Sequence, residues 1–115
     1  MSVAFKGFNE KTLTFKTDST TLTVGTPVSI SSNGTVSPTS SGNEFIGVAG
    51  TTKNGYVDVQ LTGYVKSSYT GTAPTVGRVT LGANGSGGVK VVTTGGISCI
   101  VLSVDSTSST VEFLI

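Results

Sequence analysis

Glycine and proline interrupt this chain so often that few segments are long enough for an average helix, which has about 11 residues. The interruptions run from Gly25 to Gly96. The segments between them are rich in Val, Thr, Ile and Tyr, residues that favour strands. Within these segments, apolar and polar residues alternate with the two-residue period of a strand. The sequence therefore predicts an all-β protein.

Short strands separated by turn residues are expected from residue 20 onward. The expected strands are Thr21–Val24, Pro27–Ser31, Thr35–Ser37, Glu44–Ala49, Tyr56–Leu61, Tyr64–Ser68, Arg78–Leu81, Val89–Thr93, Ile97–Val104 and Thr110–Ile115. Asn33-Gly34 and Asn54-Gly55 are typical of type I′ hairpin turns, in which both central residues have positive φ. This spacing of roughly ten residues predicts a compact sandwich or barrel. No fixed-period repeat of the kind that builds a solenoid or propeller is visible.

Two strands allow their faces to be assigned. In Tyr56–Leu61, Val57 and Val59 share one face and Asp58 lies on the other, so one side is expected to face the core. Ile97–Val104 is apolar on both faces, which predicts a central strand covered on both sides. Cys99 lies within this apolar run and is interpreted as a buried thiol.

The first part of the chain differs from the rest and leaves two interpretations open. Its apolar residues are spread over a long stretch, although Lys11–Thr17 alternates as a strand could. One interpretation is a partly extended N-terminal arm that becomes ordered against a partner; the other is an edge strand of the same domain. The domain prediction is an arm at 1–19 followed by a single β domain at 20–115.

Composition excludes several functions. At 115 residues the chain has the size of one domain, and with 11% charged residues and a net charge of +1 it lacks the dense basic patch that nucleic acid requires. Without histidine there is no His-based triad or ordinary zinc site, and a single cysteine forms no intrachain disulfide. The first residues lack the apolar core of a signal peptide, and no stretch approaches about 18 apolar residues. We therefore expect cytoplasmic synthesis and no membrane association.

The remaining chemistry-bearing patterns are interpreted as structural. The glycine-rich segment 82–90 resembles a phosphate loop, but a strand follows it, so no helix N-terminus is available to bind an anion. The carboxylates of Glu44, Asp58, Asp105 and Glu112 fall in separate elements, and Asp105 is expected to cap a turn. The sequence thus predicts neither enzymatic activity nor a cofactor.

The tyrosines form the last candidate surface. Tyr56, Tyr64 and Tyr69 lie on or beside neighbouring expected strands. They are predicted to form a subunit interface or a partner surface. The alternative is an aromatic row that stacks a sugar ring.

The order of glycines, prolines and apolar residues also resembles a known family. The residues that carry the resemblance are Val24-Gly25-x-Pro27-Val28, Asn33-Gly34-x-Val36, Phe45-x-Gly47-Val48-Ala49, Gly63-Tyr64-Val65, Pro74-x-x-Gly77, Leu81-x-Ala83-x-Gly85-x-Gly87-Gly88-Val89-Lys90, Val104-Asp105 and Val111-x-Phe113-Leu114. This pattern, over roughly residues 20 to 115, resembles the small capsid-decoration (head-stabilising) proteins of tailed bacteriophages.

The resemblance implies a β-rich protein on the outer surface of the phage head, often a homotrimer, that binds the major capsid protein and stabilises the virion. An N-terminal arm commonly becomes ordered on the capsid in such proteins. Phe5, Phe8, Leu13 and Phe15 would then be the capsid-binding anchors. The alternative is a phage fibre or tail domain, or a lectin-like β-sandwich, that binds host glycans.

Overall fold

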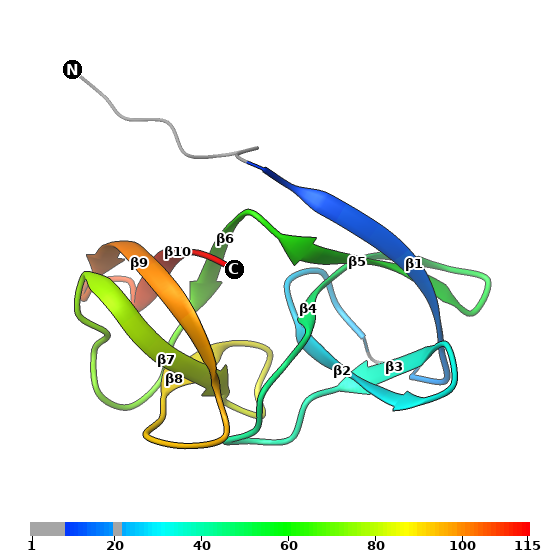
Figure 1. Ribbon diagram of the computed structural model, residues 1–115, viewed down its shortest axis with the longest axis horizontal. Helices are drawn as coiled ribbons and strands as arrows, with labels where there is room; N and C mark the ends of the chain where they lie inside the picture. Colours follow the sequence, from blue (N-terminus) through cyan, green and yellow to red (C-terminus); the bar gives the residue numbers. More distant parts are fainter. Residues whose placement is uncertain (1–8, 20–21) are drawn as a thin grey trace.

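Strands make up all the regular secondary structure of the described residues. The computed structural model describes residues 9–19 and 22–115. The strands are β1 (Lys11–Thr17), β2 (Pro27–Ser32), β3 (Thr35–Pro38), β4 (Gly47–Lys53), β5 (Tyr56–Thr62), β6 (Tyr64–Ser68), β7 (Gly77–Ala83), β8 (Val89–Val91), β9 (Ile97–Asp105) and β10 (Thr110–Leu114) (Figure 1). The prediction of an all-β fold is confirmed.

The first half of the chain forms a closed barrel with the strand order β1-β3-β2-β4-β5. β1 pairs antiparallel with β5 from Lys11 to Lys16, and its C-terminal end pairs parallel with β3. Residues 11–17 are therefore a strand of the same domain, as the alternative interpretation expected, although this strand is paired on both sides and is not an edge strand. Residues 1–8 of the predicted arm lie outside the described residues. The alternation of Lys11–Thr17 indicated a strand, but its pairing joins distant residues, such as Thr14 and Asp58, which are 44 positions apart, so its partner strand had no local sequence signal.

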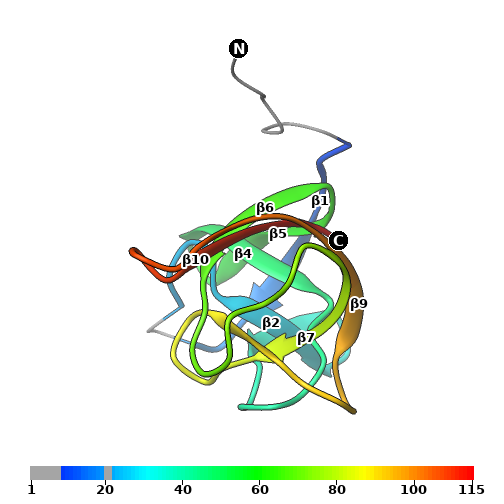
Figure 2. The ribbon, with the colours of Figure 1, turned by 90° about the vertical axis from the view of Figure 1, so that its left-hand side faces the viewer.

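The second half forms a five-stranded sheet with the order β6-β10-β9-β7-β8. Every strand pairing of the barrel has a counterpart here, with β6 to β10 in the places of β1 to β5. The parallel pairing of β1 with β3 corresponds to a single parallel bridge between Tyr69, just after β6, and Val89 in β8. The molecule thus consists of two halves with the same topology (Figures 1 and 2).

The last strand of each half shows the same alternation of side chains. Val57 and Val59 of β5 are fully buried, as are Val111 and Phe113 of β10. Between each pair stands one carboxylate on the opposite face, Asp58 in β5 and Glu112 in β10. The inward and outward faces predicted for Tyr56–Leu61 are therefore confirmed at these positions.

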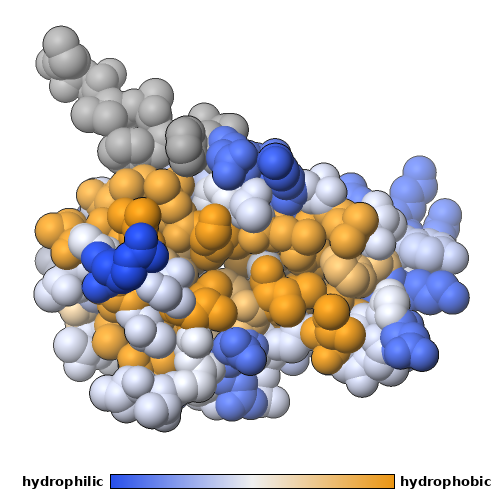
Figure 3. All heavy atoms as spheres, in the orientation of Figure 1, coloured by the Kyte–Doolittle hydropathy of each residue, from blue (hydrophilic) through white to orange (hydrophobic). Residues whose placement is uncertain are grey.

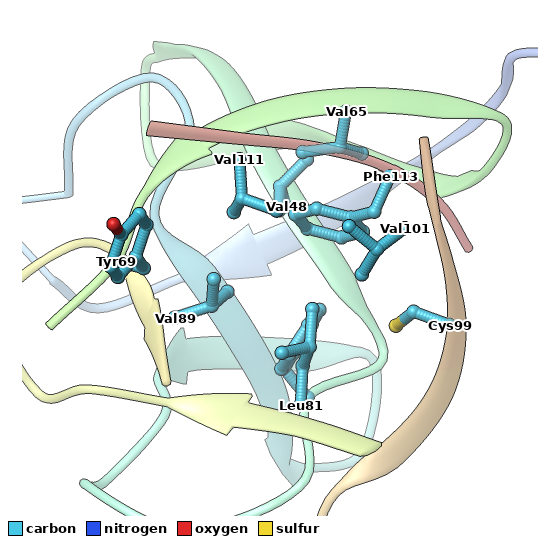
Figure 4. Close-up of a cluster of buried hydrophobic side chains, with 10 residues drawn as sticks. Val48, Val65, Tyr69, Leu81, Val89, Cys99, Val101, Val111 and Phe113 are labelled. Atoms are coloured by element: carbon cyan, nitrogen blue, oxygen red, sulfur yellow. The ribbon is translucent and has the colours of Figure 1, made fainter. Parts of the chain in front are cut away.

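Each half has its own hydrophobic core, and β4 contributes to both. Ala49 of β4 packs in the barrel cluster with Val57 and Val59, whereas the neighbouring Val48 packs in the cluster of the second half. Phe45, just before β4, also belongs to the second cluster. Figure 4 shows Val48 among side chains from the second half, including Val65, Val111 and Phe113. β4 is thus a wall common to both cores.

Several local predictions require correction. The strand expected at Thr21–Val24 is not formed in its described residues, because Val24 and Gly25 make a turn in which Gly25 has a φ of +90°. The strand expected from Glu44 begins only at Gly47 and continues to Lys53.

The turn and central-strand predictions are each right in part. Asn54 and Gly55 both have positive φ, as a type I′ turn requires, but in the Asn33-Gly34 turn only Gly34 does. β9 is paired on both sides, as expected of a central strand. However, Ile100 in β9 is 37% exposed, so the strand is not covered on both faces.

Candidate functional site

Side chains that could ligate a metal do not cluster in the part of the chain that the structure describes. Over residues 9–19 and 22–115, no group of three His, Cys, Asp or Glu side chains could hold a metal ion. Cys99 is 1% exposed, as predicted, and burial raises the pKa of its thiol to about 12. A thiol with such a pKa stays protonated at neutral pH and is a poor nucleophile. Every buried side-chain nitrogen or oxygen in these ranges has a hydrogen-bond partner.

The glycine-rich segment 82–90 comprises the end of β7, a loop at residues 84–88 and the start of β8. The Asn84 side-chain oxygen accepts hydrogen bonds from the backbone N–H groups of Ser86 and Gly88, at 2.7 and 3.0 Å. These N–H groups are thereby satisfied inside the loop and are not aimed at an anion. Lys90 donates to the Ser41 hydroxyl at 2.9 Å. The structural interpretation of this segment is confirmed.

Asp105 caps the turn between β9 and β10, as predicted. Its side-chain oxygen accepts hydrogen bonds from the backbone N–H groups of Thr107 and Ser108, at 3.0 and 3.3 Å. Bonds from the Ser108 hydroxyl and from these N–H groups hold the pKa of the carboxyl below its ordinary value. The Asp105 carboxylate therefore stabilises this turn.

The three tyrosines do not form one exposed row. Tyr56 is 49% exposed on β5, and Tyr64 is half-buried at the start of β6. Tyr69 is only 8% exposed and belongs to the core of the second half (Figure 4). The prediction that Tyr69 lies on a partner surface is therefore corrected, because its ring fills the core beside β8. The three rings therefore do not form an exposed row on which a sugar ring could stack.

The predicted capsid anchors fall into three situations. Phe5 and Phe8 lie outside the described residues. Phe15 is half-buried and packs against the barrel core, so it contributes to the fold, and its role as a capsid anchor stays a prediction. Leu13 stands opposite Val59 across the β1–β5 pair and is 53% exposed, which leaves it available to a partner.

Large apolar side chains are exposed at several further positions that the sequence did not single out. Together with the predicted residues Leu13 and Tyr56, the exposed set comprises Val24, Ile30, Val76 and Ile100. Val24 and Val76, at 76% and 68%, are the most exposed of them, and each precedes a glycine with positive φ. This repeated arrangement of an exposed valine before a glycine is recognised only when the strands of one half are matched to those of the other. Figure 3 shows apolar residues gathered in a band across one face of the molecule, flanked by hydrophilic ones.

A groove of about 380 Å³ lies where the two halves meet. Its apolar lining comes from the loop before β2, from β4 and from β6, through Val24, Val48, Ala49 and Val65. Val48, Ala49 and Val65 are at most 5% exposed and form its floor, while Val24 projects beside it. The volume lies within the roughly 300–1,000 Å³ typical of sites that bind a compact group. We call this feature the junction groove.

Polar side chains surround the junction groove. Glu10, Asp58 and Lys66 are all among the residues that line it. In the barrel, the Thr14 hydroxyl donates a hydrogen bond of 2.8 Å to the Asp58 carboxylate. In the second half, the Tyr64 hydroxyl donates a hydrogen bond to the Glu112 carboxylate. In each half, therefore, a hydroxyl of the first strand is bonded to the carboxylate of the last.

Gln60 fixes the connection between the halves at the same place. Its side-chain N–H donates to the backbone oxygens of Thr62 and Tyr64, at 3.1 and 2.8 Å. Because Gln60 and Tyr64 both line the junction groove, the connection that joins the halves also forms part of its wall. The shape of the groove is thereby tied to the turn from β5 to β6.

Comparisons with known proteins leave the family open. No protein-family model matches the chain, and no curated protein matches its sequence. Among the described residues, no helix is long and apolar enough to cross a membrane.

Proposed function

We propose that this protein is a structural capsid-decoration protein that binds the outer surface of a tailed-bacteriophage head. Its partner would be the major capsid protein, and many copies would together stabilise the lattice. The proposal is supported by the pattern of glycines, prolines and apolar residues over residues 20 to 115. In such a role the protein makes or breaks no covalent bond and needs no cofactor.

The exposure of large apolar side chains on a sparsely charged surface is the observation that carries this proposal. Only 11% of the residues are charged, yet Val24, Val76 and Leu13 are all more than half exposed. Apolar groups gathered on a surface mark places where another molecule binds. A surface of this kind favours contact through shape and apolar burial, so we expect binding to depend weakly on salt.

The rigidity of the fold suits a mechanical role. Each strand of the barrel is paired on both sides. The last described residue, Ile115, exchanges two backbone hydrogen bonds of 3.0 Å with Gly63. Many copies of such a unit would convert modest single contacts into strong reinforcement of a shell. Assembly as a homotrimer belongs to the same proposal.

The test is co-sedimentation with empty expanded heads of a tailed bacteriophage whose virions contain the protein. The wild type should pellet with the heads, and the double variant Val24→Asp, Val76→Asp should lose about tenfold or more in affinity, which corresponds to about 1.4 kcal/mol. Thr51→Asp, which adds a carboxylate at an exposed polar position, is the matched control and should bind like the wild type.

Abundance in purified virions provides an independent check. Decoration requires copies in near-stoichiometric proportion to the major capsid protein. A handful of copies per virion, or glycan binding that survives the two aspartate substitutions, would instead identify a fibre or tail module. Size-exclusion chromatography with light scattering would establish whether the protein is a trimer.

A further inference from the structure

We propose that the junction groove is the docking site for the N-terminal segment 3–8 of the same chain, with the side chains of Phe5 and Phe8 in the groove. The proposal concerns the isolated protein and does not depend on the capsid role.

The groove begins where the N-terminal segment enters the fold. Glu10 and Thr12, the second and fourth described residues, are part of its lining. Phe8 is therefore within two residues of the groove. At no more than about 3.6 Å per residue, Phe5 lies within roughly 14 Å of Asn9, so both rings can reach the groove without any rearrangement of β1.

The backbone at Asn9 is shaped to turn the chain away from the strand direction. Asn9 has a φ of +48°, in the left-handed region that turns use. Its carbonyl accepts a hydrogen bond of 2.8 Å from the Thr62 hydroxyl, which holds this residue against the end of β5. Asn9, directly before the groove residue Glu10, is thus held in place.

The chemistry of the segment matches that of the groove. Val3, Phe5 and Phe8 are apolar, as is the floor made by Val48 and Val65. Lys6 lies between the two phenylalanines in the sequence. The residues that line the groove include two acidic ones, Glu10 and Asp58, and one basic one, Lys66, so their net charge is complementary to that lysine.

Segment 3–8 of the same chain is favoured over the segment of a second copy because it is covalently tethered close to the groove. A short linker holds its ligand at an effective concentration of about millimolar. Free copies of the protein at micromolar concentration cannot match this value. In the free protein, the groove should therefore bind its own segment in preference to that of a second copy.

The test is disulfide trapping with Ala4→Cys and Val24→Cys, which leaves both phenylalanines in place. Val24 lines the groove and is 76% exposed, so the substitution should not disturb folding. Mild oxidation should give an intrachain disulfide in a monomer, with Cys99 as the only thiol left for alkylation after denaturation. Ala4→Cys with Val76→Cys is the position control, because Val76 is similarly exposed but does not line the groove.

Proximity alone could also bring residue 4 close to Val24, so a second comparison is needed. Adding Phe5→Ser and Phe8→Ser to the Ala4→Cys, Val24→Cys protein should slow intrachain trapping by about tenfold if the rings hold the segment in the groove. Deleting residues 1–8 should shift the methyl NMR signals of Val48 and Val65 while leaving those of Val28 and Val36, inside the barrel, unchanged.

Three results would overturn the proposal. Trapping that is equally fast with and without the phenylalanines would show that the segment only collides with the groove. A product made mainly of interchain dimers would show that the groove takes the segment of a second copy. Methyl signals that do not respond to the deletion would show that the segment does not occupy the groove at all.

Discussion

Val24 and Val76 occupy equivalent positions in the two halves of the protein. Each is the residue before a positive-φ glycine that leads into the second strand of its half, and each is largely exposed. Neither contributes to the two hydrophobic clusters. Their apolar surface therefore lies outside both cores, which separates their roles from those of the buried valines.

Aspartate substitutions should reveal this difference directly. Val59→Asp buries an unpaired carboxylate in the barrel, where Val59 is 0% exposed, and should destabilise the protein by about 4 kcal/mol or more. Val24→Asp and Val76→Asp should each change stability by no more than about 0.5 kcal/mol. Urea denaturation followed by circular dichroism measures all three, and a large loss in either exposed variant would contradict the assignment.

Alanine substitutions in β1 should show that this strand is part of the fold. Phe15→Ala removes a half-buried ring that packs against the barrel core and should cost about 1–3 kcal/mol. Leu13→Ala, at a position 53% exposed, should cost less than about 1 kcal/mol. Thermal unfolding of the two variants makes the comparison; equal and negligible effects would mean that β1 is dispensable for folding.

Gly47 at the start of β4 should not tolerate a side chain. A Cβ atom there would lie 2.1 Å from the backbone oxygen of Gln60, which cannot move without breaking the β4–β5 pairing. Gly47→Ala should therefore cost about 3 kcal/mol or more. Gly71→Ala is the matched control: its Cβ would meet nothing within 4 Å, so only the positive φ of 75° opposes it, at about 1–2 kcal/mol.

Alkaline pH should destabilise the protein partly through Tyr64. Burial, the hydrogen bond to Glu112 and the charge of that carboxylate raise the pKa of Tyr64 from 10.0 to about 12. The unfolded state therefore loses this proton first, and the stabilisation is fully present below pH 10 and lost as the pH rises toward 12. Tyr64→Phe should flatten the fall in stability between pH 10 and 12, with Tyr56→Phe as the matched control. An unchanged slope would contradict the role assigned to this bond.

The Cys99 thiol should react only when the protein opens. Because Cys99 is 1% exposed and its pKa is about 12, alkylation at pH 8 should be undetectable on the timescale of minutes in the native state. In denaturant the same thiol should react at the rate of a free cysteine. Mass spectrometry after brief iodoacetamide treatment distinguishes the two states, and rapid labelling of the native protein would show that β9 is not closed over the thiol.

Strands whose signals are local could be predicted from the sequence. The strand at Tyr64–Ser68 has the predicted bounds, and β5, β9 and β10 differ from prediction by one residue at one end. Alternation of side chains and the Asn54-Gly55 turn are properties of neighbouring residues, so they can be read from a short window. The strand predicted at Thr21–Val24 is wrong because the prediction rested on the residue types of this short window. The turn at Val24-Gly25 depends instead on the positive φ of Gly25.

Features that depend on distant pairing could not be predicted. The place of β1 in the barrel rests on β5 and β3, and the similarity of the two halves lies in pairing and burial rather than in residue identity. The junction groove arises because Val48 and Val65, from different halves, pack into one cluster. Among the candidate residues, Leu13 and Tyr56 are exposed and Tyr69 is buried. The burial of Tyr69 could not be predicted because this residue pairs with the distant Val89.

The contacts of Thr62 and Gly63 bring both ends of the described fold to one point. The Thr62 hydroxyl donates a hydrogen bond to the carbonyl of Asn9, and the neighbouring Gly63 is hydrogen-bonded to Ile115. A peptide or protein fused before Asn9 and another fused after Ile115 would therefore emerge side by side from the same spot. The scaffold could carry two different cargoes as a closely spaced pair.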